Sequence, residues 1–381
     1  MGIYLDSHTA SRPFPSSIER MHALFKTAWG SLSAPHQIGQ DALSVANTSL
    51  QIIYDFLGAG EKDIFTFTSS GSEAISQVFL STYTDLVREN GKNHFMTTTL
   101  EGASIFHSLE RLEKLGCVSK KLPVSSRGQL TKEILQEAIR PRSALLSLSW
   151  ANSLTGVINP IHDLAEVCKE KEVKFHVDAG SVLGKLFFRF QDLGVDYLTF
   201  DGDILHAPKG TGGLLQKESS FLSRLVVGDP DCSAPAIGGL ATSFTLLQEH
   251  FDHVCMETAR LRDRLEQGIL DGFPEATVFF ANVERLPNTA VIAFPGIFNE
   301  ALLYALHRKG VYASIGGNRS QKIAEILQAC GVSKELASTS ICFSLSYETT
   351  QKNIDDAIAI ILDAAKNLSR TSKGFFEVPH G

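Results

Sequence analysis

Long apolar runs are missing from this sequence. No uninterrupted stretch approaches the roughly 18 to 20 apolar residues that a helix needs to cross a bilayer, so the sequence predicts no membrane span. A basic leader is missing as well, because the first residues, MGIYLDSHTAS, contain no Lys or Arg and include Asp6. Secretory signals begin with a basic stretch, and we therefore expect a cytoplasmic protein.

Paired cysteines and clusters of basic residues are also missing. The six cysteines are scattered singly, without C-x-x-C spacing and without a His at a metal-ligand interval. This pattern predicts separate reduced thiols, no disulfide framework and no metal site. Acidic residues outnumber basic ones by 42 to 35, a formal charge of −7, and no stretch is rich in Lys and Arg, so we expect no nucleic-acid partner.

The sequence does contain enough apolar material for a large folded core. The chain has 381 residues, of which 43% are hydrophobic and 20% charged, and this length favours two domains. Up to about residue 245, short apolar runs alternate with helical stretches, a pattern typical of a parallel sheet covered on both faces. The expected strands are Ile64–Thr68, Phe95–Thr98, Ala144–Ser149, Val173–Val177 and Tyr197–Phe200, and the expected helices are Glu73–Arg88, Ser104–Leu115, Thr131–Ile139 and Ile161–Lys171.

The pattern changes in the last third of the chain to a smaller α/β unit. We expect residues 21–245 to form a large domain, and residues 1–20 with 246–381 to form a small one. The tail from Ser369 onward is polar and is expected to lie outside the folded part. The expected elements of the small unit are helices at Leu246–Leu270, Asn299–Arg308, Ser320–Cys330 and Gln351–Leu368, and strands at Thr289–Phe294, Val311–Ser314 and Ile341–Leu345.

Four segments carry the chemical information. The first, Thr68–Ala74, follows a strand and opens a helix, so its small residues could bring backbone N–H groups to an anion, although on this segment alone ordinary N-capping by Ser70 or Ser72 is the better explanation. The second, Phe175–Lys185, places Asp178 at the carboxyl end of a buried strand, where α/β sheets bind ligands. The third and fourth are Leu205–Gly213 and Arg285–Thr289.

In this order and spacing, the segments resemble the NifS/IscS-like cysteine desulfurases of the class V aminotransferase family. Tyr4-Leu5-Asp6 near the start and Phe343-Ser344-Leu345 near the end extend the resemblance over almost the whole chain. It implies an α/β fold of the pyridoxal-phosphate transferase type I, with a mostly parallel seven-stranded sheet in the large domain and a smaller α/β C-terminal domain. It also implies a homodimer and pyridoxal phosphate as the cofactor.

The groups that the resemblance requires for catalysis are replaced in this chain. Counting back from His206-Ala207-Pro208-Lys209-Gly210, the position of the imine-forming lysine is Ile204, which can neither form an imine nor carry a proton. The residues at the other three catalytic positions are Gly102 for the ring-stacking histidine, Arg319 near the place of the sulfur-accepting cysteine, and Cys342 for the carboxylate-binding arginine.

The cofactor contacts are only partly kept. Asp178, which would face the pyridine nitrogen, is present, and Ser72, Ser153 and Ser181 are similar polar replacements, so we interpret these four as vestigial cofactor-binding residues. The phosphate-binding serine is replaced by Asp201. A carboxylate about 4 Å from a phosphate charge costs about 4 kcal/mol at an effective dielectric near 20, so we expect pyridoxal phosphate to be absent or weakly bound.

Three hypotheses follow. The leading one is a catalytically inactive desulfurase-like protein that acts by binding, as a homodimer or as a partner of a paralogous desulfurase or an iron–sulfur scaffold. The second is an active pyridoxal-phosphate enzyme that uses Lys209 or Lys185 for the imine. The third is new acid–base or metal chemistry of Asp201, Asp203 and His206. The family's dimer loop has no clear match around residues 228–231.

Overall fold

The computed structural model describes residues 2–226, 232–317 and 321–376, with side chains as far as residue 370. Its centre is a seven-stranded sheet in the order β2-β8-β7-β6-β5-β3-β4. Every strand is parallel to the others except β8, which runs antiparallel to both of its neighbours. The strands are β2 (Ile64–Thr68), β3 (His94–Thr98), β4 (Val118–Leu122), β5 (Ser143–Ser149), β6 (Lys174–Asp178), β7 (Tyr197–Asp201) and β8 (Gly212–Gln216).

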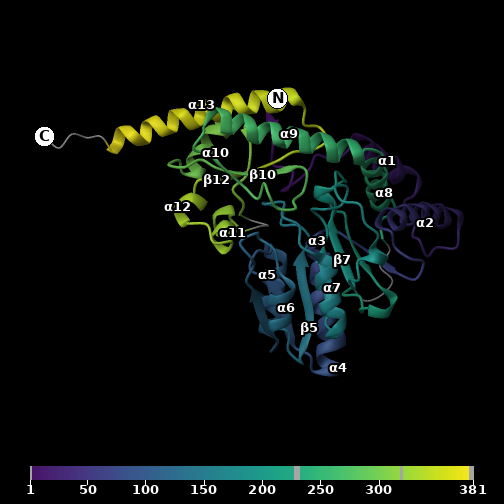
Figure 1. Cartoon of the computed structure of the whole chain (residues 1–381). Helices are drawn as coiled ribbons and strands as arrows, with labels where there is room; N and C mark the ends of the chain where they lie inside the picture. Colours follow the sequence, from purple (N-terminus) through teal and green to yellow (C-terminus); the bar gives the residue numbers. More distant parts are fainter. Residues whose placement is uncertain (1, 227–231, 318–320, 377–381) are drawn as a thin grey trace.

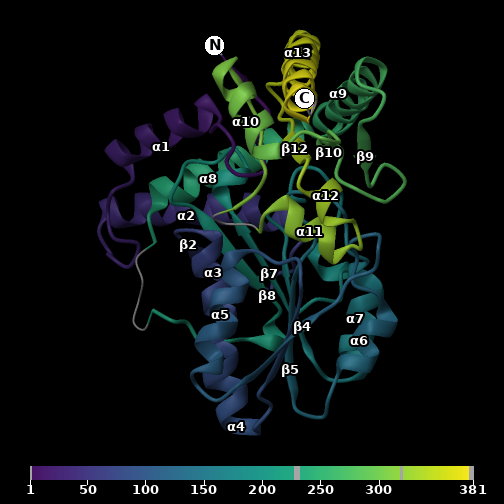
Figure 2. The same ribbon diagram turned by 90° about the vertical axis from the view of Figure 1, so that its left-hand side faces the viewer.

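Helices cover both faces of this sheet, as the near-continuous burial of its inner strands requires. Figure 2 shows α3 (Gly71–Thr82) and α5 (Ala103–Glu113) on one side of the strands, and α6 (Lys132–Ala138) and α7 (Ile161–Glu170) on the other. Neighbouring residues of one strand serve opposite layers, since Leu145 packs with α3 and α5 whereas Leu146 packs with α6 and α7. The α/β fold with a mostly parallel seven-stranded sheet is therefore confirmed.

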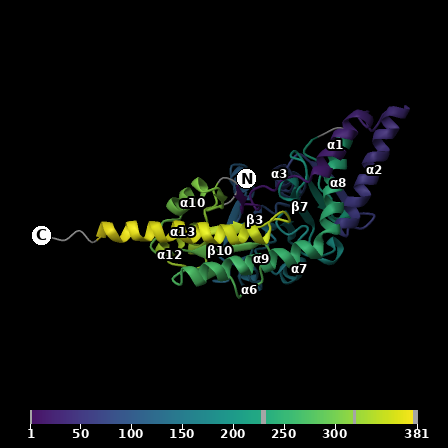
Figure 3. The ribbon, with the colours of Figure 1, turned by 90° about the horizontal axis from the view of Figure 1, so that it is seen from above.

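The second part of the molecule is a small α/β unit, which lies above the central sheet in Figure 1. Its antiparallel sheet has the order β12-β10-β9, and β1 pairs with β11 in parallel. Its main helix, α13, lies along α9 and continues past the rest of the unit (Figure 3). The elements are β1 (Ile3–Tyr4), α9 (Phe251–Gly272), β9 (Thr277–Phe279), β10 (Thr289–Ala293), α10 (Asn299–Arg308), β11 (Val311–Tyr312), α11 (Ile323–Ala329), α12 (Lys334–Ala337), β12 (Ser340–Ser344) and α13 (Gln351–Phe376).

The remaining elements connect these two parts or extend the large one. Helices α1 and α2 pack against α8 at one side of the large sheet (Figure 3). Short turns of helix follow several strands, and one of them, η3, carries residues of the candidate site. These elements are α1 (Pro15–Thr27), α2 (Gln37–Leu57), η1 (Tyr83–Val87), α4 (Arg88–Asn90), η2 (Phe190–Asp192), η3 (Gly202–Ile204), η4 (Glu218–Ser220) and α8 (Ala234–Glu249).

The expected elements differ from the structure at several places, and the helix expected over Glu73–Arg88 is divided, because α3 ends at Thr82 and η1 follows it. The single helix expected over Leu246–Leu270 is wrong, because α8 ends at Glu249, His250 leaves the helix with ψ near 5°, and α9 begins at Phe251. The last helix extends to Phe376 and so includes residues expected to lie in a loose tail. Strands β4 and β8 were not expected, and β4 carries two lysines as edge strands do.

The hydrophobic core is divided in the same way as the sheets. One large cluster lies on the central sheet and includes Phe14, and a second joins Leu5 to the buried faces of α9, α10 and α13. The proposed domain limits, 21–245 against 1–20 with 246–381, stay a prediction. Among the described residues, no helix is both long and apolar enough to cross a bilayer.

Candidate functional site

The candidate site is a cavity of about 340 Å³ at the carboxyl edge of the central sheet, closed on one side by the small unit. It brings together seven of the residues assigned from the sequence to catalytic or cofactor-binding positions, since Ser72, Gly102, Ser153, Asp178, Ser181, Asp201 and Ile204 all line it. Cys342 does not line it, and Arg319 and the 228–231 loop lie outside the described residues. The other lining residues are Asp6, His8, Thr9, Gly71, Ile75, Leu100, Ser104, Ile105, Ser149, Asn152, Ser314, Gly316 and Gly317.

Ile204 packs against the backbone beside Asp178. It ends the 3-10 turn η3 that follows β7, and its side chain is partly buried against the core of the large sheet. A Cβ built on Gly180 would lie 2.8 Å from Ile204 Cδ1 and 3.5 Å from Asp178 Oδ1. Ile204 therefore presents hydrocarbon next to the carboxylate, at the position where the resemblance places an amine.

Asp178 ends β6 and is held by its neighbours in the sheet. Its Oδ1 accepts a hydrogen bond from the Gly180 N–H at 3.3 Å. Burial raises the pKa of the Asp178 carboxyl to about 6, and the nearby charge of Asp201 adds to the rise, while the Gly180 N–H and the Thr199 hydroxyl oppose it. Asp178 is thus an ionised carboxylate at neutral pH that becomes protonated in mild acid.

The N-terminus of α3 is bound by a carboxylate of the chain itself. The Gly71 N–H donates to Asp201 Oδ2 at 3.2 Å, and the Asp203 N–H donates to Asp201 Oδ1 at 3.0 Å. A Cβ on Gly71 would approach Asp201 Cβ to 2.9 Å, so helix and carboxylate are closely packed. The expected N-cap is confirmed, because Ser70 Oγ accepts from the Glu73 N–H at 3.2 Å. The helix end that could bind an anion is therefore already occupied by Asp201.

Glu101 lies beneath the cavity and is fully engaged. Its carboxylate accepts from Thr98 Oγ1 at 2.6 Å, from the Ser149 N–H at 2.9 Å and from Ser149 Oγ at 2.7 Å. Burial raises the pKa of Glu101 to about 7 in spite of these hydrogen bonds. The next residue, Gly102, is the N-cap of α5 and offers no ring to the cavity.

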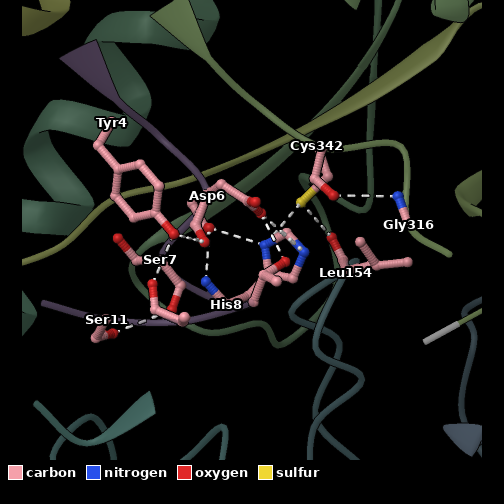
Figure 4. Close-up of polar contacts among 12 residues, drawn as sticks. Tyr4, Asp6, Ser7, His8, Ser11, Leu154, Gly316 and Cys342 are labelled. Atoms are coloured by element: carbon pink, nitrogen blue, oxygen red, sulfur yellow. Dashed lines mark hydrogen bonds and ion pairs between the residues drawn. The ribbon is translucent and has the colours of Figure 1, made fainter. Parts of the chain in front are cut away.

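The N-terminal segment supplies site residues that the sequence reasoning missed. Figure 4 shows the His8 imidazole between Asp6 and Cys342. The His8 side chain is 6% exposed, its Nδ1 lies 2.8 Å from Ser344 Oγ, and its Nε2 lies 3.4 Å from Asp6 Oδ1. Burial lowers the pKa of His8 to about 4, so the ring is neutral at physiological pH.

Cys342 lies behind His8 and away from the cavity. Its Sγ is 3.8 Å from His8 Nδ1, and its thiol donates to the Leu154 carbonyl at 3.0 Å (Figure 4). The side chain is completely buried, and burial raises the pKa of the thiol well above its usual range. Cys342 is therefore a protonated core thiol. The signal for His8 in the sequence was its position two residues after Asp6, shortly beyond the N-terminal strand.

Neither lysine named as a substitute amine lines the cavity. Lys209 has a 71% exposed side chain and pairs with Asp203 at 3.8 Å. Lys185 lines a separate space of about 20 Å³ that shares the Ile204 side chain with the candidate site. Its Nζ donates to the Ser181 carbonyl at 3.1 Å, and burial lowers the pKa of the amine to about 8.

The residues of the third hypothesis do not converge on one point. His206 Nδ1 donates to the Arg12 carbonyl at 2.7 Å, and the ring packs against Phe14 and Tyr347. Within residues 2–226, 232–317 and 321–376, no group of three or more His, Cys, Asp or Glu side chains is arranged to hold a metal ion. The described part of the cavity thus offers carboxylates, hydroxyls and one neutral imidazole, but no amine or thiol.

Comparisons with known proteins agree with this architecture. The family model described as Aminotransferase class-V matches residues 3–229. A cysteine desulfurase of Bradyrhizobium diazoefficiens is 30% identical over 97% of this chain and 96% of its own length, and cysteine desulfurase 2 of Trichormus variabilis is 33% identical over 97% and 94%. A solved NifS-like protein superposes with a TM-score of 0.89 at 25% identity, covering 97% of this chain and 100% of that one.

Proposed function

Because the chain belongs to the class V aminotransferase family and is a cysteine desulfurase-like member of it, we propose that it is a catalytically inactive member that acts by binding. The single observation that carries the proposal is Ile204, whose hydrocarbon packs on Gly180 beside Asp178. The family's reaction depends on pyridoxal phosphate held by a lysine, which supplies an electron sink for the substrate. No amine lines the described part of the cavity.

The phosphate site supports the same proposal. Asp201 Oδ2 already accepts from the Gly71 N–H, and its negative charge would lie close to a bound phosphate. Two other catalytic positions support the proposed inactivity. Gly102 offers no ring to stack on the cofactor, and Cys342, at the position of the carboxylate-binding arginine, is a buried, protonated thiol. The residues present therefore do not fit pyridoxal phosphate, and we propose that the cofactor is absent or weakly bound.

The proposal is tested by mixing the purified full-length protein with pyridoxal phosphate and reducing it with borohydride. We expect no imine absorbance, no pyridoxyl-lysine in the peptide map and no sulfide release from cysteine. An active desulfurase treated in parallel shows that the reagents work. A pyridoxyl group on Lys185 or Lys209, together with cysteine-dependent sulfide, would show instead that the imine lysine has been relocated.

We further propose that the protein forms a homodimer through the side that carries α1 and α2. Four large apolar side chains there are exposed to between 41% and 64% in the single chain, which is typical of a protein interface. They are Ile18, Phe25, Trp29 and Ile38. Light scattering of the protein and of the Trp29→Glu variant tests this, since the variant should shift towards monomer. A paralogous desulfurase or an iron–sulfur scaffold is the further partner to test by co-purification.

A further inference from the structure

The charged groups that line the described part of the cavity are all acidic. Asp6 comes from the small unit and Asp178 from the end of β6, whereas the Asp201 carboxylate is engaged with backbone N–H groups. None of the lining residues that the structure describes is Lys or Arg. An anionic ligand therefore meets two carboxylates here without a described cation to offset them.

A second and independent feature is a buried donor without an acceptor. Ser344 Oγ accepts from the His8 N–H at 2.9 Å, and among the described residues His8 Nδ1, 2.8 Å away, is the acceptor within reach of its own proton, so we assign that proton to the Oγ–Nδ1 contact. The neutral ring then carries its proton on Nε2. Nε2 is buried and has no hydrogen-bond partner, although Asp6 Oδ1 is 3.4 Å away. Because an unsatisfied buried donor is costly, the structure favours a ligand atom that accepts from His8 Nε2.

The neighbourhood of Nε2 selects the kind of acceptor. An atom bound to His8 Nε2 lies close to the Asp6 carboxylate, because Asp6 Oδ1 and His8 Nε2 are only 3.4 Å apart. A neutral hydroxyl or thiol can bind at this point without electrostatic repulsion, whereas a carboxylate is repelled by the negative charge of Asp6. Since burial keeps His8 uncharged at neutral pH, the ring does not offset that repulsion. A ligand that carries a carboxylate as well as an amine thus binds less favourably, because its carboxylate is repelled by Asp6.

We propose that the cavity binds a small primary amine that bears a hydroxyl or thiol and lacks a carboxylate. Its ammonium group pairs with Asp178, and its hydroxyl or thiol accepts from His8 Nε2 beside Asp6. The cavity of about 340 Å³ is of the size that holds small molecules. This inference rests on the proposed function, because an imine-bound cofactor would fill the same space, and it adds the ligand class that the inactive cleft recognises.

The test uses two probes that differ only in the carboxylate. Cysteamine and cysteine are titrated into the full-length protein under reducing conditions, and binding is followed by calorimetry or ligand-observed NMR. We expect saturable binding of cysteamine and binding of cysteine weaker by about tenfold or more, the scale of one unfavourable charge pair. Asp178→Asn should weaken cysteamine binding, and Asp271→Asn, the same change on the exposed surface of α9, should leave it unchanged.

The Asp6→Asn variant gives a test that a loss of folded protein does not affect. Its readout is the ratio of the affinities for cysteine and cysteamine, and partial unfolding lowers both affinities equally. Removing the charge next to His8 Nε2 should bring the affinities for cysteine and cysteamine closer together. Equal binding of both probes by the unaltered protein, or an unchanged ratio in Asp6→Asn, would overturn the inference. Failure of both probes to bind would also overturn it while leaving the proposed inactivity intact, whereas sulfide release from cysteine would overturn the proposed function itself.

Discussion

Asp201 Oδ2 accepts a hydrogen bond from the Gly71 N–H at 3.2 Å, so a carboxylate of the chain binds the N-terminus of α3. Helix N-termini attract anions because their first N–H groups lack partners within the helix and the helix dipole is positive there. In this protein the Asp201 carboxylate is the anion that binds there. An aspartate at position 201, where the resemblance places a phosphate-binding serine, thus stabilises α3 and at the same time takes the N–H group that a phosphate would bind.

The first prediction concerns this contact. Asp201→Ser should lower the free energy of unfolding by about 0.5 to 2 kcal/mol, the usual cost of losing a cap. It should also make the protein bind inorganic phosphate, because the Gly71 N–H becomes available. Urea denaturation with and without phosphate measures both effects.

The matched control is Asp192→Ser, an exposed aspartate in η2. It should leave the stability within about 0.5 kcal/mol of the unaltered protein and create no phosphate dependence. Phosphate that stabilises the unaltered protein as strongly as Asp201→Ser would contradict the argument.

The second prediction restores the missing amine. In the double variant Asp201→Ser with Ile204→Lys, borohydride should trap pyridoxal phosphate on residue 204, because both barriers are removed. Ile204→Lys alone should be labelled less, since Asp201 still occupies the end of α3. Peptide mass spectrometry measures the labelled fraction. Equal labelling of the single and double variants would mean that Asp201 does not oppose the phosphate. No sulfide release is expected from either variant.

The third prediction concerns pH. Burial gives Glu101 a folded-state pKa of about 7, above its ordinary value of 4.5, so the folded protein keeps a proton that the unfolded chain has lost. Its contribution to stability is therefore present below about pH 4.5 and is lost as pH rises through about 7, with a slope of at most ~1.4 kcal/mol per pH unit. Glu101→Gln lacks this loss, so its stability relative to the unaltered protein should improve between about pH 5 and about pH 8.

Urea denaturation of both proteins at the two pH values gives the comparison. The buried His8 and His176 have lowered pKa values and act in the opposite direction, but they are present in both proteins and cancel. Glu61→Gln, at an exposed position, should show no change of relative stability with pH. A pH-independent difference for Glu101→Gln would show that Glu101 is not protonated on folding.

The fourth prediction tests a buried ion pair within the small unit. Arg285 binds both carboxylate oxygens of Glu266, at 2.6 and 2.9 Å, and the two side chains are 5% and 10% exposed. Its backbone also bridges to Val157 of the large part. Arg285→Met leaves Glu266 buried without a partner and should cost about 3 to 5 kcal/mol.

Thermal or urea denaturation measures this loss, and two variants calibrate it. Arg264→Met removes a half-exposed pair with Asp355 and should cost less than about 1 kcal/mol. Adding Glu266→Leu to Arg285→Met should recover part of the stability, because no charge is then left buried. If the two single arginine variants were equally destabilised, burial would not be the cause.

Much of the fold could be predicted because the relevant patterns are local. The apolar run Ile64–Thr68 is a strand and Asn299–Arg308 is a helix at the predicted limits, and the family resemblance is confirmed by full-length relatives. Strand β4 was missed because its lysines hide the apolar alternation at the sheet edge. The helix break at His250 was missed because it follows from packing against different parts of the molecule.

The candidate site was predictable only where its residues belong to motifs. Ser72, Asp178 and Ile204 converge as expected because strand ends of a parallel sheet meet at one edge. His8 could not be predicted, since its role depends on Ser344, which is 336 residues away in the chain. The Asp201–Gly71 contact likewise joins residues 130 positions apart.

The break at His250 has a consequence for how the two cores are connected along the chain. Helix α8 is packed on α1 and α2, whereas α9 is packed on α13, so the two ends of one nearly continuous helical stretch are anchored in different cores. The backbone torsions of His250 therefore set the angle between α8 and α9, while other contacts, such as the bridge between Val157 and Arg285, also join the two cores.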